Sequence, residues 1–211
     1  MKFQVNKDVL SEAVSFAVRL LPQRTTLPIL GGILIEADAN ALRLSVFDYE
    51  VSAQIEVVAK VDEPGRILVS GRLLADIANR LPNAPVEFSS EANKMIVQCG
   101  SSKFQLITMS VDSYPTLPEI PVASGTIPAD AFAEAISQVA VASAKEDTTQ
   151  VYSTVELEAD AKTITFLATD RFRIALREVD WKGPAESSVA LVPARTLIDV
   201  AKTFSNLGDI S

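Results

Sequence analysis

The sequence contains no histidine, a single cysteine and no glycine-rich phosphate loop, and each of these features disfavours a class of function. Without histidine, it lacks the commonest general base and the commonest metal ligand. Cys99 cannot form an internal disulfide, and it lies in an alternating stretch that predicts a strand, where we expect it to pack. Leu30-Gly31-Gly32 matches neither phosphate-binding glycine motif. The composition therefore disfavours an enzyme and predicts no metal and no cofactor.

Long apolar runs are missing as well. No stretch approaches the roughly 18 uninterrupted apolar residues that span a bilayer, and Met1 to Asp8 has no apolar signal segment. We therefore expect a cytoplasmic protein with no membrane partner. The net charge of -8 disfavours nonspecific coating of nucleic acid by the whole surface, so the distribution of the charges matters more than their sum.

What the sequence does contain is a repeat. Residues 35–53 recur at a constant offset of 122, so that Asp38 and Asp48 correspond to Asp160 and Asp170. Each copy predicts a helix, three antiparallel strands and a second helix. In the first copy these elements fall at 7–21, 33–36, 42–46, 51–57 and 71–81, and three further strands follow at 86–89, 95–99 and 104–108.

The segment from Tyr114 to Pro121 is rich in proline, which cannot donate to a sheet, and it predicts a linker. We therefore expect two domains, residues 1–120 and 125–211. The second copy ends soon after its second helix, at 193–204, where the first copy continues through three strands. This difference predicts that the second domain is truncated and that the chain is part of a longer protein.

The charges divide unevenly between the predicted elements. The four helical segments carry a net +2, which leaves -10 for the strands and loops. Helices gathered on one side would give a mildly basic surface that attracts a phosphate backbone without reading bases. Ordinary soluble helices also carry lysine and arginine, so the charge alone leaves both interpretations open.

Two other features allow alternative interpretations. Asp48 and Asp170 occupy equivalent strand ends, and they are either carboxylates of a hydrolase or turn residues whose side chains accept backbone N–H groups. Thr169–Ile174 has two arginines that its first-copy counterpart lacks. This divergence indicates a function specific to the second copy, while the alternation of the same residues also fits an ordinary strand.

Taken together, these motifs resemble the bacterial sliding clamp family, the beta subunit of DNA polymerase III, and most of all its actinobacterial members. The resemblance rests on Met1–Phe3, Arg24–Gly31, Pro64-Gly65, Val69–Arg72, Tyr114-Pro115, Phe132–Ile136, Ala168–Ala175 and Val192–Arg195. It implies an α+β DNA-clamp fold, with tandem domains that each pack two helices on small antiparallel β-sheets. Members of this family have three such domains, so the resemblance implies that the third is absent here.

The resemblance also implies a function. Two copies of a complete subunit form a ring around duplex DNA, and the ring tethers the replicative polymerase without catalysing any reaction. Expected partners are nonspecific double-stranded DNA, a second copy in a homodimer, and the polymerase catalytic subunit, clamp loader and repair proteins, which bind through linear peptide motifs. A peptide-binding scaffold that does not encircle DNA is the alternative, and a hydrolase is a more distant one.

Residue by residue, the resemblance assigns three surfaces. DNA contacts fall on Arg24, Arg72, Arg80, Arg195 and Lys202. One wall of the partner-peptide pocket falls on Tyr152, Thr169, Arg171, Phe172, Arg173 and Ile174. The dimer interface falls on Phe104 and Leu106. Because the other pocket wall and the dimer partner surface belong to the third domain, we expect this chain alone not to close a ring.

Overall fold

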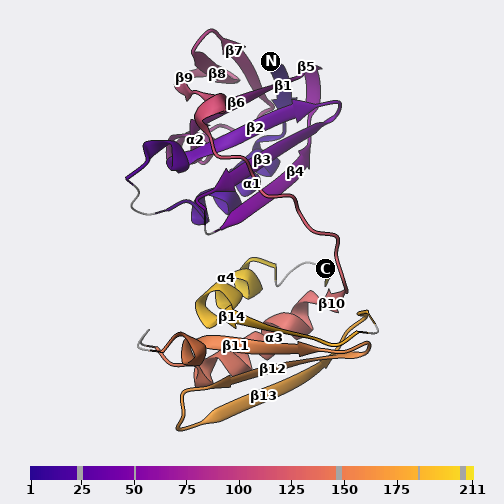
Figure 1. Ribbon diagram of the computed structural model, residues 1–211. Coiled ribbons are helices and arrows are strands. Elements are labelled where there is room, and N and C mark those ends of the chain that lie inside the picture. Colours follow the sequence, from indigo (N-terminus) through magenta and orange to yellow (C-terminus); the bar gives the residue numbers. More distant parts are fainter. Residues whose placement is uncertain (23–25, 50, 146–148, 185, 205–207) are drawn as a thin grey trace. The chain divides into compact units, whose positions relative to one another are not determined.

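The computed structural model describes residues 1–22, 26–49, 51–145, 149–184, 186–204 and 208–211. They form two compact units, Met1–Glu119 and Ile120–Ser211 (Figure 1). Within these described ranges, no helix is both long and apolar enough to cross a membrane.

The first unit contains one nine-stranded antiparallel sheet, ordered β4-β3-β2-β6-β9-β8-β7-β1-β5. Its strands are β1 (Lys2–Val5), β2 (Gly32–Asp38), β3 (Ala41–Phe47), β4 (Ser52–Val58), β5 (Lys60–Glu63), β6 (Gly65–Ser70), β7 (Val86–Glu91), β8 (Lys94–Cys99) and β9 (Ser102–Met109). Its helices are α1 (Lys7–Arg19) and α2 (Gly71–Ala78), with short 3-10 turns η1 (Pro28–Gly31) and η2 (Val111–Ser113). β6 and β9 pair over only two residues each, and this short junction joins the two halves of the sheet.

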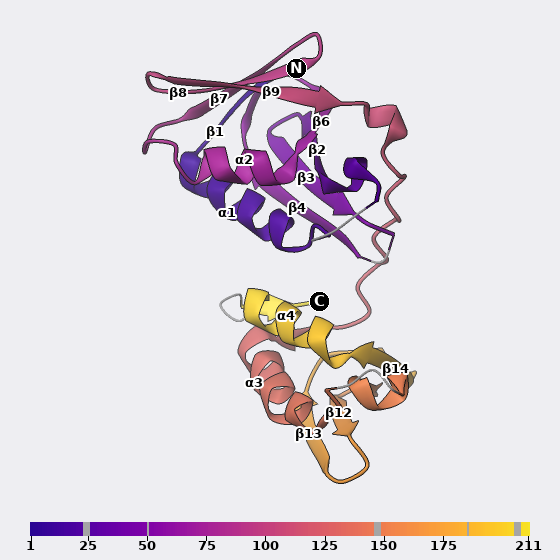
Figure 2. The same ribbon diagram turned by 90° about the vertical axis from the view of Figure 1, so that its left-hand side faces the viewer.

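Helix α1 forms because its ends and one face are both specified locally. The side chain of Asn6 caps it by accepting a hydrogen bond from the backbone N–H of Asp8 at 2.8 Å. Leu10, Val14 and Ala17 then recur with helical spacing and are buried. Figure 2 shows α1 and α2 side by side along one face of the sheet, where they cover the core of the first unit.

The second unit has a four-stranded antiparallel sheet, ordered β13-β12-β11-β14, and a separate pair of short strands, β10 and β15. Its elements are β10 (Ile127–Pro128), α3 (Ala129–Val139), η3 (Ala140–Ala142), η4 (Gln150–Ser153), β11 (Thr154–Ala159), β12 (Thr163–Thr169), β13 (Ile174–Asp180), β14 (Ser188–Pro193), α4 (Ala194–Phe204) and β15 (Asp209–Ile210). α3 and α4 pack against each other on one face of the sheet, around Phe132 and Phe166.

The predicted repeat is confirmed in three dimensions. β3 and β4 become β12 and β13 at an offset of 122 residues, and β6 becomes β14 at an offset of 123. Even the 3-10 turn η1 has its counterpart in η4 at 122. The α+β class and the pairing of two helices with small antiparallel sheets are therefore as predicted.

The structure differs from the sequence expectations at several elements: α2 ends at Ala78 rather than at residue 81, and the short strands β10 and β15 were not predicted. β5 was not predicted, because its residues are mostly charged and it lies at a sheet edge. The predicted linker began at Tyr114, yet Tyr114 is buried against the first unit. Residues without regular structure therefore begin after Tyr114 rather than at it.

Candidate functional site

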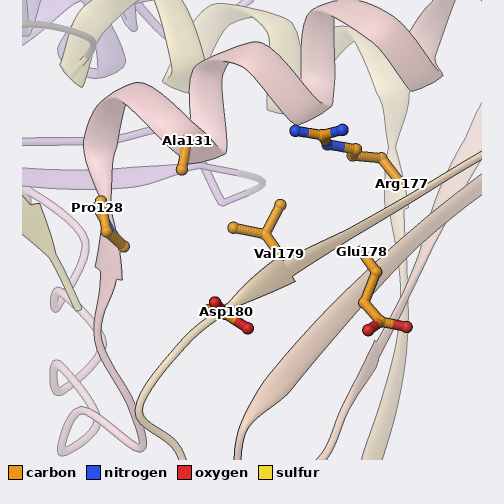
Figure 3. Close-up of a pocket in the computed structure, with 6 residues that line it drawn as sticks. All are labelled: Pro128, Ala131, Arg177, Glu178, Val179 and Asp180. Atoms are coloured by element: carbon orange, nitrogen blue, oxygen red, sulfur yellow. The ribbon is translucent and has the colours of Figure 1, made fainter.

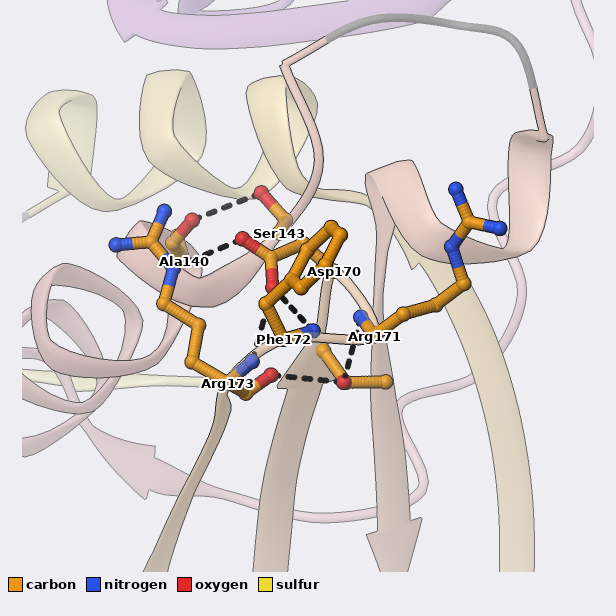
Figure 4. A network of polar contacts seen from close by, with 7 residues as sticks. Ala140, Ser143, Asp170, Arg171, Phe172 and Arg173 are labelled. Carbon is orange, nitrogen blue, oxygen red and sulfur yellow. Dashed lines mark hydrogen bonds and ion pairs between the residues drawn. The ribbon is translucent and has the colours of Figure 1, made fainter.

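The turn between β12 and β13, residues Thr169–Ile174, is organised by one carboxylate (Figure 4). Oδ1 of Asp170 accepts hydrogen bonds from the backbone N–H groups of Phe172 and Arg173, both at 3.1 Å. Oδ2 accepts a hydrogen bond from Nε of Arg173 at 2.9 Å, which is also an ion pair. Partial burial raises the pKa of Asp170, but the two N–H groups and Arg173 outweigh it and hold the pKa below its usual value.

Asp48 has the same role in the first unit. Its side chain accepts a hydrogen bond from the backbone N–H of Val51 at 2.7 Å, and Val51 is the counterpart of Arg173. The interpretation of Asp48 and Asp170 as turn residues is confirmed. Asp170, which already accepts two backbone hydrogen bonds and has a lowered pKa, is poorly suited to general acid–base catalysis. Within the described part of the chain, no cluster of side chains could hold a metal ion.

Arg171 occupies an unusual backbone conformation in this turn. Its φ is +79°, and Tyr49, at the equivalent position of the first unit, has a φ of +73°. The backbone N–H of Arg171 donates to Oγ1 of Thr169 at 3.2 Å. The guanidinium carbon lies 5.3 Å from the ring centroid of Tyr152, a cation–π contact that joins the turn to η4. Four residues predicted for the peptide pocket therefore form one connected structure: Tyr152, Thr169, Arg171 and Arg173.

The same turn exposes large apolar side chains. Phe172 is 92% exposed, and Ile174 at the start of β13 is 68% exposed. Leu176 continues the row two residues later on the same side of the strand, and it is also exposed. Apolar side chains of this size that gather beside a cationic turn are typical of a docking surface. Sequence analysis did not select Leu176, although its alternation with Ile174 was the signal that could have identified it.

The cations predicted to contact DNA lie at the helices of their own units. The four that fall within the described residues are all exposed: Arg72, Arg80, Arg195 and Lys202. Arg72 Nη2 donates to the carbonyl oxygen of Pro22 at 3.0 Å, which ties the start of α2 to the end of the α1 segment. Because α2 ends at Ala78, Arg80 follows the helix rather than belonging to it. Arg24, predicted to contact DNA, lies outside the described residues.

The residues predicted for a dimer interface, Phe104 and Leu106, both lie on β9. Leu106 is buried in the core of the first unit, and Phe104 is half-buried against that core. Side chains alternate along a strand, so Ile107 points to the side of the sheet opposite to Phe104 and Leu106, and it is 74% exposed. It is the apolar side chain of this strand that the first unit leaves most accessible, and sequence analysis did not select it.

Two hollows lined by described residues lie away from every predicted site residue. One, of about 390 Å³, lies between the start of α3 and β13 (Figure 3). It is lined by Pro128, Ala131, Arg177, Glu178, Val179 and Asp180. Figure 3 shows Arg177 and Val179 directed toward α3, whereas the Glu178 carboxylate points away. The other, of about 400 Å³, lies beside Tyr114 in the first unit.

Comparison with protein families assigns both units. Residues 1–118 match the family model described as DNA polymerase III beta subunit, N-terminal domain. Residues 126–210 match the model described as DNA polymerase III beta subunit, central domain. The two models therefore follow one another in the same order as the two compact units.

Curated relatives and solved structures agree with this assignment. The chain is 50% identical over 208 residues to the beta sliding clamp of Streptomyces coelicolor, covering 98% of this chain and 55% of the relative. It is 47% identical over 213 residues to that of Micrococcus luteus, covering 100% of this chain and 68% of the relative. It also resembles the crystal structure of a Pseudomonas aeruginosa sliding clamp bound to griselimycin, at 27% identity and a TM-score of 0.91, covering 99% of this chain and 58% of that one. The chain thus spans about half the length of the Streptomyces relative.

Proposed function

The chain belongs to the family of DNA polymerase III beta subunits, and from this premise we propose that the complete protein is a sliding clamp. In this proposal it encircles duplex DNA as a homodimer and tethers the replicative DNA polymerase. The carrying observation is that two units of one fold follow each other in the order of the family's N-terminal and central domains, each with two helices packed side by side.

The charge distribution supports a surface for DNA on the helices. Within their observed bounds the four helices have a net charge of -1, and the rest of the chain has -7. The exposed cations Arg72, Arg80, Arg195 and Lys202 lie on or directly after helices α2 and α4. Such cations would contact phosphates without reading bases, which is what a sliding ring requires. Tethering would raise the effective concentration of the polymerase at the primer end, so the protein would act without catalysing a reaction of its own.

Retention on topologically closed DNA tests this function. The complete protein, loaded by its clamp loader onto nicked circular DNA, should stay bound during gel filtration and leave after the circle is linearised. A protein that dissociates equally fast from circular and linear DNA would not be a ring. This chain by itself should sediment with a mass that does not support a closed ring, because the proposed dimer joins the exposed side of β9, at Ile107, to a further domain of the complete subunit.

Charge variants separate helix contacts from general electrostatics. Replacing Arg195 or Lys202 with alanine should lower the slope of log affinity against log salt by about 1 for each cation removed. Lys162 in the β11–β12 turn is a matched control, because it is an exposed cation away from the helices, and its replacement should leave the slope unchanged. Equal effects at all three positions would contradict a helical DNA surface.

We also propose that the Thr169–Ile174 turn receives linear peptides from the polymerase, the clamp loader and repair proteins. The exposed ring of Phe172 and the connected arginines support this assignment. Phe172→Ala should weaken the binding of a polymerase-derived peptide to the complete protein by about tenfold, as expected for an aromatic hot spot. Arg72→Ala should leave that affinity unchanged.

The same pair of variants separates the sliding clamp from a scaffold that binds peptides without encircling DNA. In a clamp, Phe172→Ala reduces peptide binding while Arg72→Ala, together with Arg24→Ala, reduces DNA retention. In a scaffold, peptide binding depends on Phe172 but circular DNA is not retained by the wild-type protein at all.

A further inference from the structure

The proline-rich segment that begins at Tyr114 has no part in the proposed DNA surface or in the proposed peptide site. Its prolines recur at every third position, Pro115, Pro118 and Pro121, and an apolar or aromatic residue precedes each one. Two of these pairs lie together in the run Leu117-Pro118-Glu119-Ile120-Pro121. A polyproline II helix has three residues per turn, so in that conformation the three prolines share one edge of the segment.

The sequence restricts most of this segment to the polyproline II conformation. Each proline fixes its own φ near the required value, and the residue before a proline is disfavoured in the helical region. Six of the eight residues 114–121 are restricted in this way, namely the three prolines and the three residues that precede them. Tyr114 itself has a φ of -77° and a ψ of 139°, close to the ideal values of about -75° and +145°.

The exposure of the side chains changes after Leu117. Leu117 is half-buried against the cluster that contains Tyr114, whereas residues 118–124 are all exposed. Ile120 is 70% exposed and Val122 is 92% exposed. A segment that served only as a stiff spacer would need its prolines but not these exposed apolar side chains.

The backbone of the segment is also accessible. Within the described part of the chain, residues 115–125 form no hydrogen bond, and the next backbone pair along the chain is that of Thr126 with Lys182. The carbonyl oxygens of a polyproline II segment are therefore open to donors from a partner. A ligand that is already extended before it binds loses little conformational entropy on binding.

The charge along this part of the chain has one sign. No lysine or arginine occurs between Lys103 and Lys145, whereas Asp112 and Glu119 are both acidic and exposed. Glu119 lies between Pro118 and Pro121, on a different edge of a three-residue turn from the prolines. A partner surface with a cation beside the segment therefore fits better than an acidic surface.

We propose that residues 117–122 are a docking segment for a partner protein whose groove is lined with aromatic side chains and flanked by a cation. Segments with this spacing of prolines bind in aromatic-lined grooves because they are extended before they bind. At a rise of about 3.1 Å per residue, Pro118 and Pro121 lie roughly 9 Å apart, which sets the distance between the two pockets of the groove. Ile120 enters the groove together with Pro121, and Glu119 faces the cation.

A purified SH3 domain is the probe for this docking, because its groove is lined with aromatic side chains. In a second form of the same domain, side chains beside the groove are replaced with lysine. Each form is titrated into the isotope-labelled chain, and the amide signals of Ile120 and Val122 are followed by NMR. Both forms should bind, and the lysine form should bind about threefold more tightly because it faces Glu119.

Proline variants locate the contact. Pro118→Ala together with Pro121→Ala should weaken binding about tenfold, because both anchors of the groove are removed. Pro115→Ala is the matched control, because Pro115 is half-buried and precedes the docking segment, and it should change the affinity by less than about twofold. Glu119→Gln should remove the preference for the lysine form. Thermal unfolding should be the same in all these variants except Pro115→Ala, since the other three side chains are exposed.

The inference would be overturned if neither form of the probe shifted the signals of Ile120 and Val122 at millimolar concentration. Equal weakening by Pro115→Ala would also overturn it, because the stiffness of the whole segment would then decide binding. A preference for lysine that survives Glu119→Gln would contradict the cationic flank.

The titration is repeated with the complete protein, where failure of the segment to bind would count against the inference in the same way. The complete protein with Pro118→Ala and Pro121→Ala should be retained on closed circular DNA like the wild type. Loss of docking and loss of the proposed sliding function are therefore distinguished by this one variant.

Discussion

Strands β4-β3-β2-β6 and the two helices of the first unit recur in the second unit as β13-β12-β11-β14 and α3 and α4, yet the side chains at equivalent positions differ. Ala59 is buried in the first unit, and its counterpart in the second unit is Trp181. Both donate their backbone N–H to the equivalent turn, Ala59 to the carbonyl of Asn40 at 3.0 Å and Trp181 to that of Lys162 at 2.8 Å. The shared backbone thus tolerates a methyl group at one site and an indole at the other, because what packs around the site differs.

The indole is held by backbone on two sides. Trp181 Nε1 donates to the carbonyl oxygen of Asp160 at 2.6 Å. Gly125 and Gly183 lie so close to the ring that a Cβ on either would overlap it. Thr126 and Lys182 form a bridge beside it, which anchors the chain where it enters the second unit. Trp181 therefore connects the entry segment to the sheet, a task that β1 and β5 perform in the first unit through a longer pairing.

Trp181→Ala should give the largest effect and should confine it to the second unit. Removing the indole leaves a cavity and frees the entry segment, so we expect a loss of about 3 kcal/mol in the stability of that unit. Hydrogen exchange measured by mass spectrometry should show faster exchange in peptides from residues 126–184 and no change in those from the first unit.

Val58→Ala is the control for Trp181→Ala, because an exposed edge residue should change stability by less than about 0.5 kcal/mol. If Trp181→Ala accelerated exchange equally in both units, the two would not unfold independently and the comparison between them would fail.

Tyr114→Phe tests how the segment after β9 is held on the first unit, and it should have the second largest effect. The ring would stay buried, but the backbone N–H of Phe47 would lose its hydrogen-bond partner, so we expect a loss of about 1–2 kcal/mol. Hydrogen exchange should accelerate in the first unit alone, including the Phe47 amide. Tyr49→Phe is the matched control, because the Tyr49 side chain is exposed and no hydrogen bond of its hydroxyl is recorded among the described residues.

The same hydroxyl makes the first unit sensitive to alkaline pH. Burial raises the pKa of Tyr114, a hydrogen bond with Phe47 lowers it, and the charge of Asp48 raises it, so the pKa lies above its usual value. In the unfolded chain the tyrosine hydroxyl loses its proton near pH 10. The stabilisation that the protonated Tyr114 hydroxyl gives the folded unit is therefore complete below about pH 10, and it is lost as the pH rises through the folded pKa. The stability advantage of the wild type over Tyr114→Phe should therefore shrink above pH 10.

The spacing of apolar residues along the chain predicted the repeated strands and helices. It could not predict features that depend on contacts between residues far apart in the sequence. Leu42, Leu44 and Val46 alternate along the chain, so the sequence identifies β3 without knowledge of its neighbours. Tyr114 has no such periodicity among its prolines, and its partner Phe47 is 67 residues away. No pattern within a window of the sequence could have placed that hydroxyl.

The candidate site likewise has one part that the sequence predicts and one part that it does not. The offset of 122 identified the turn at Asp170, and its backbone hydrogen bonds are those of any Asx turn. The contact between Arg171 and Tyr152 depends on a positive φ and on the position of η4, neither of which the residue types predict. Arginine is in fact a poor candidate for a positive φ, since glycine and asparagine adopt it more readily.

Substitutions at Arg171 and Tyr49 should separate the strain that the two turns share from the contact that only the second one has. Both residues have positive φ, so glycine should be more stable than alanine by about 1 kcal/mol at either position. Arg171→Ala should cost a further 0.5–1 kcal/mol or so, because it also removes the cation–π contact with Tyr152.

The Tyr152→Leu background provides the control for this last comparison. In that background the additional cost of Arg171→Ala should disappear, while the difference between glycine and alanine remains, because backbone strain does not depend on the aromatic ring. Urea unfolding of each variant, followed by exchange in the second unit, measures both quantities. The stability difference between glycine and alanine could be present at Tyr49 but absent at Arg171. The second turn would then relax when its arginine is removed. In that case the cation–π contact, rather than the hydrogen bonds of Asp170, holds the backbone at a positive φ.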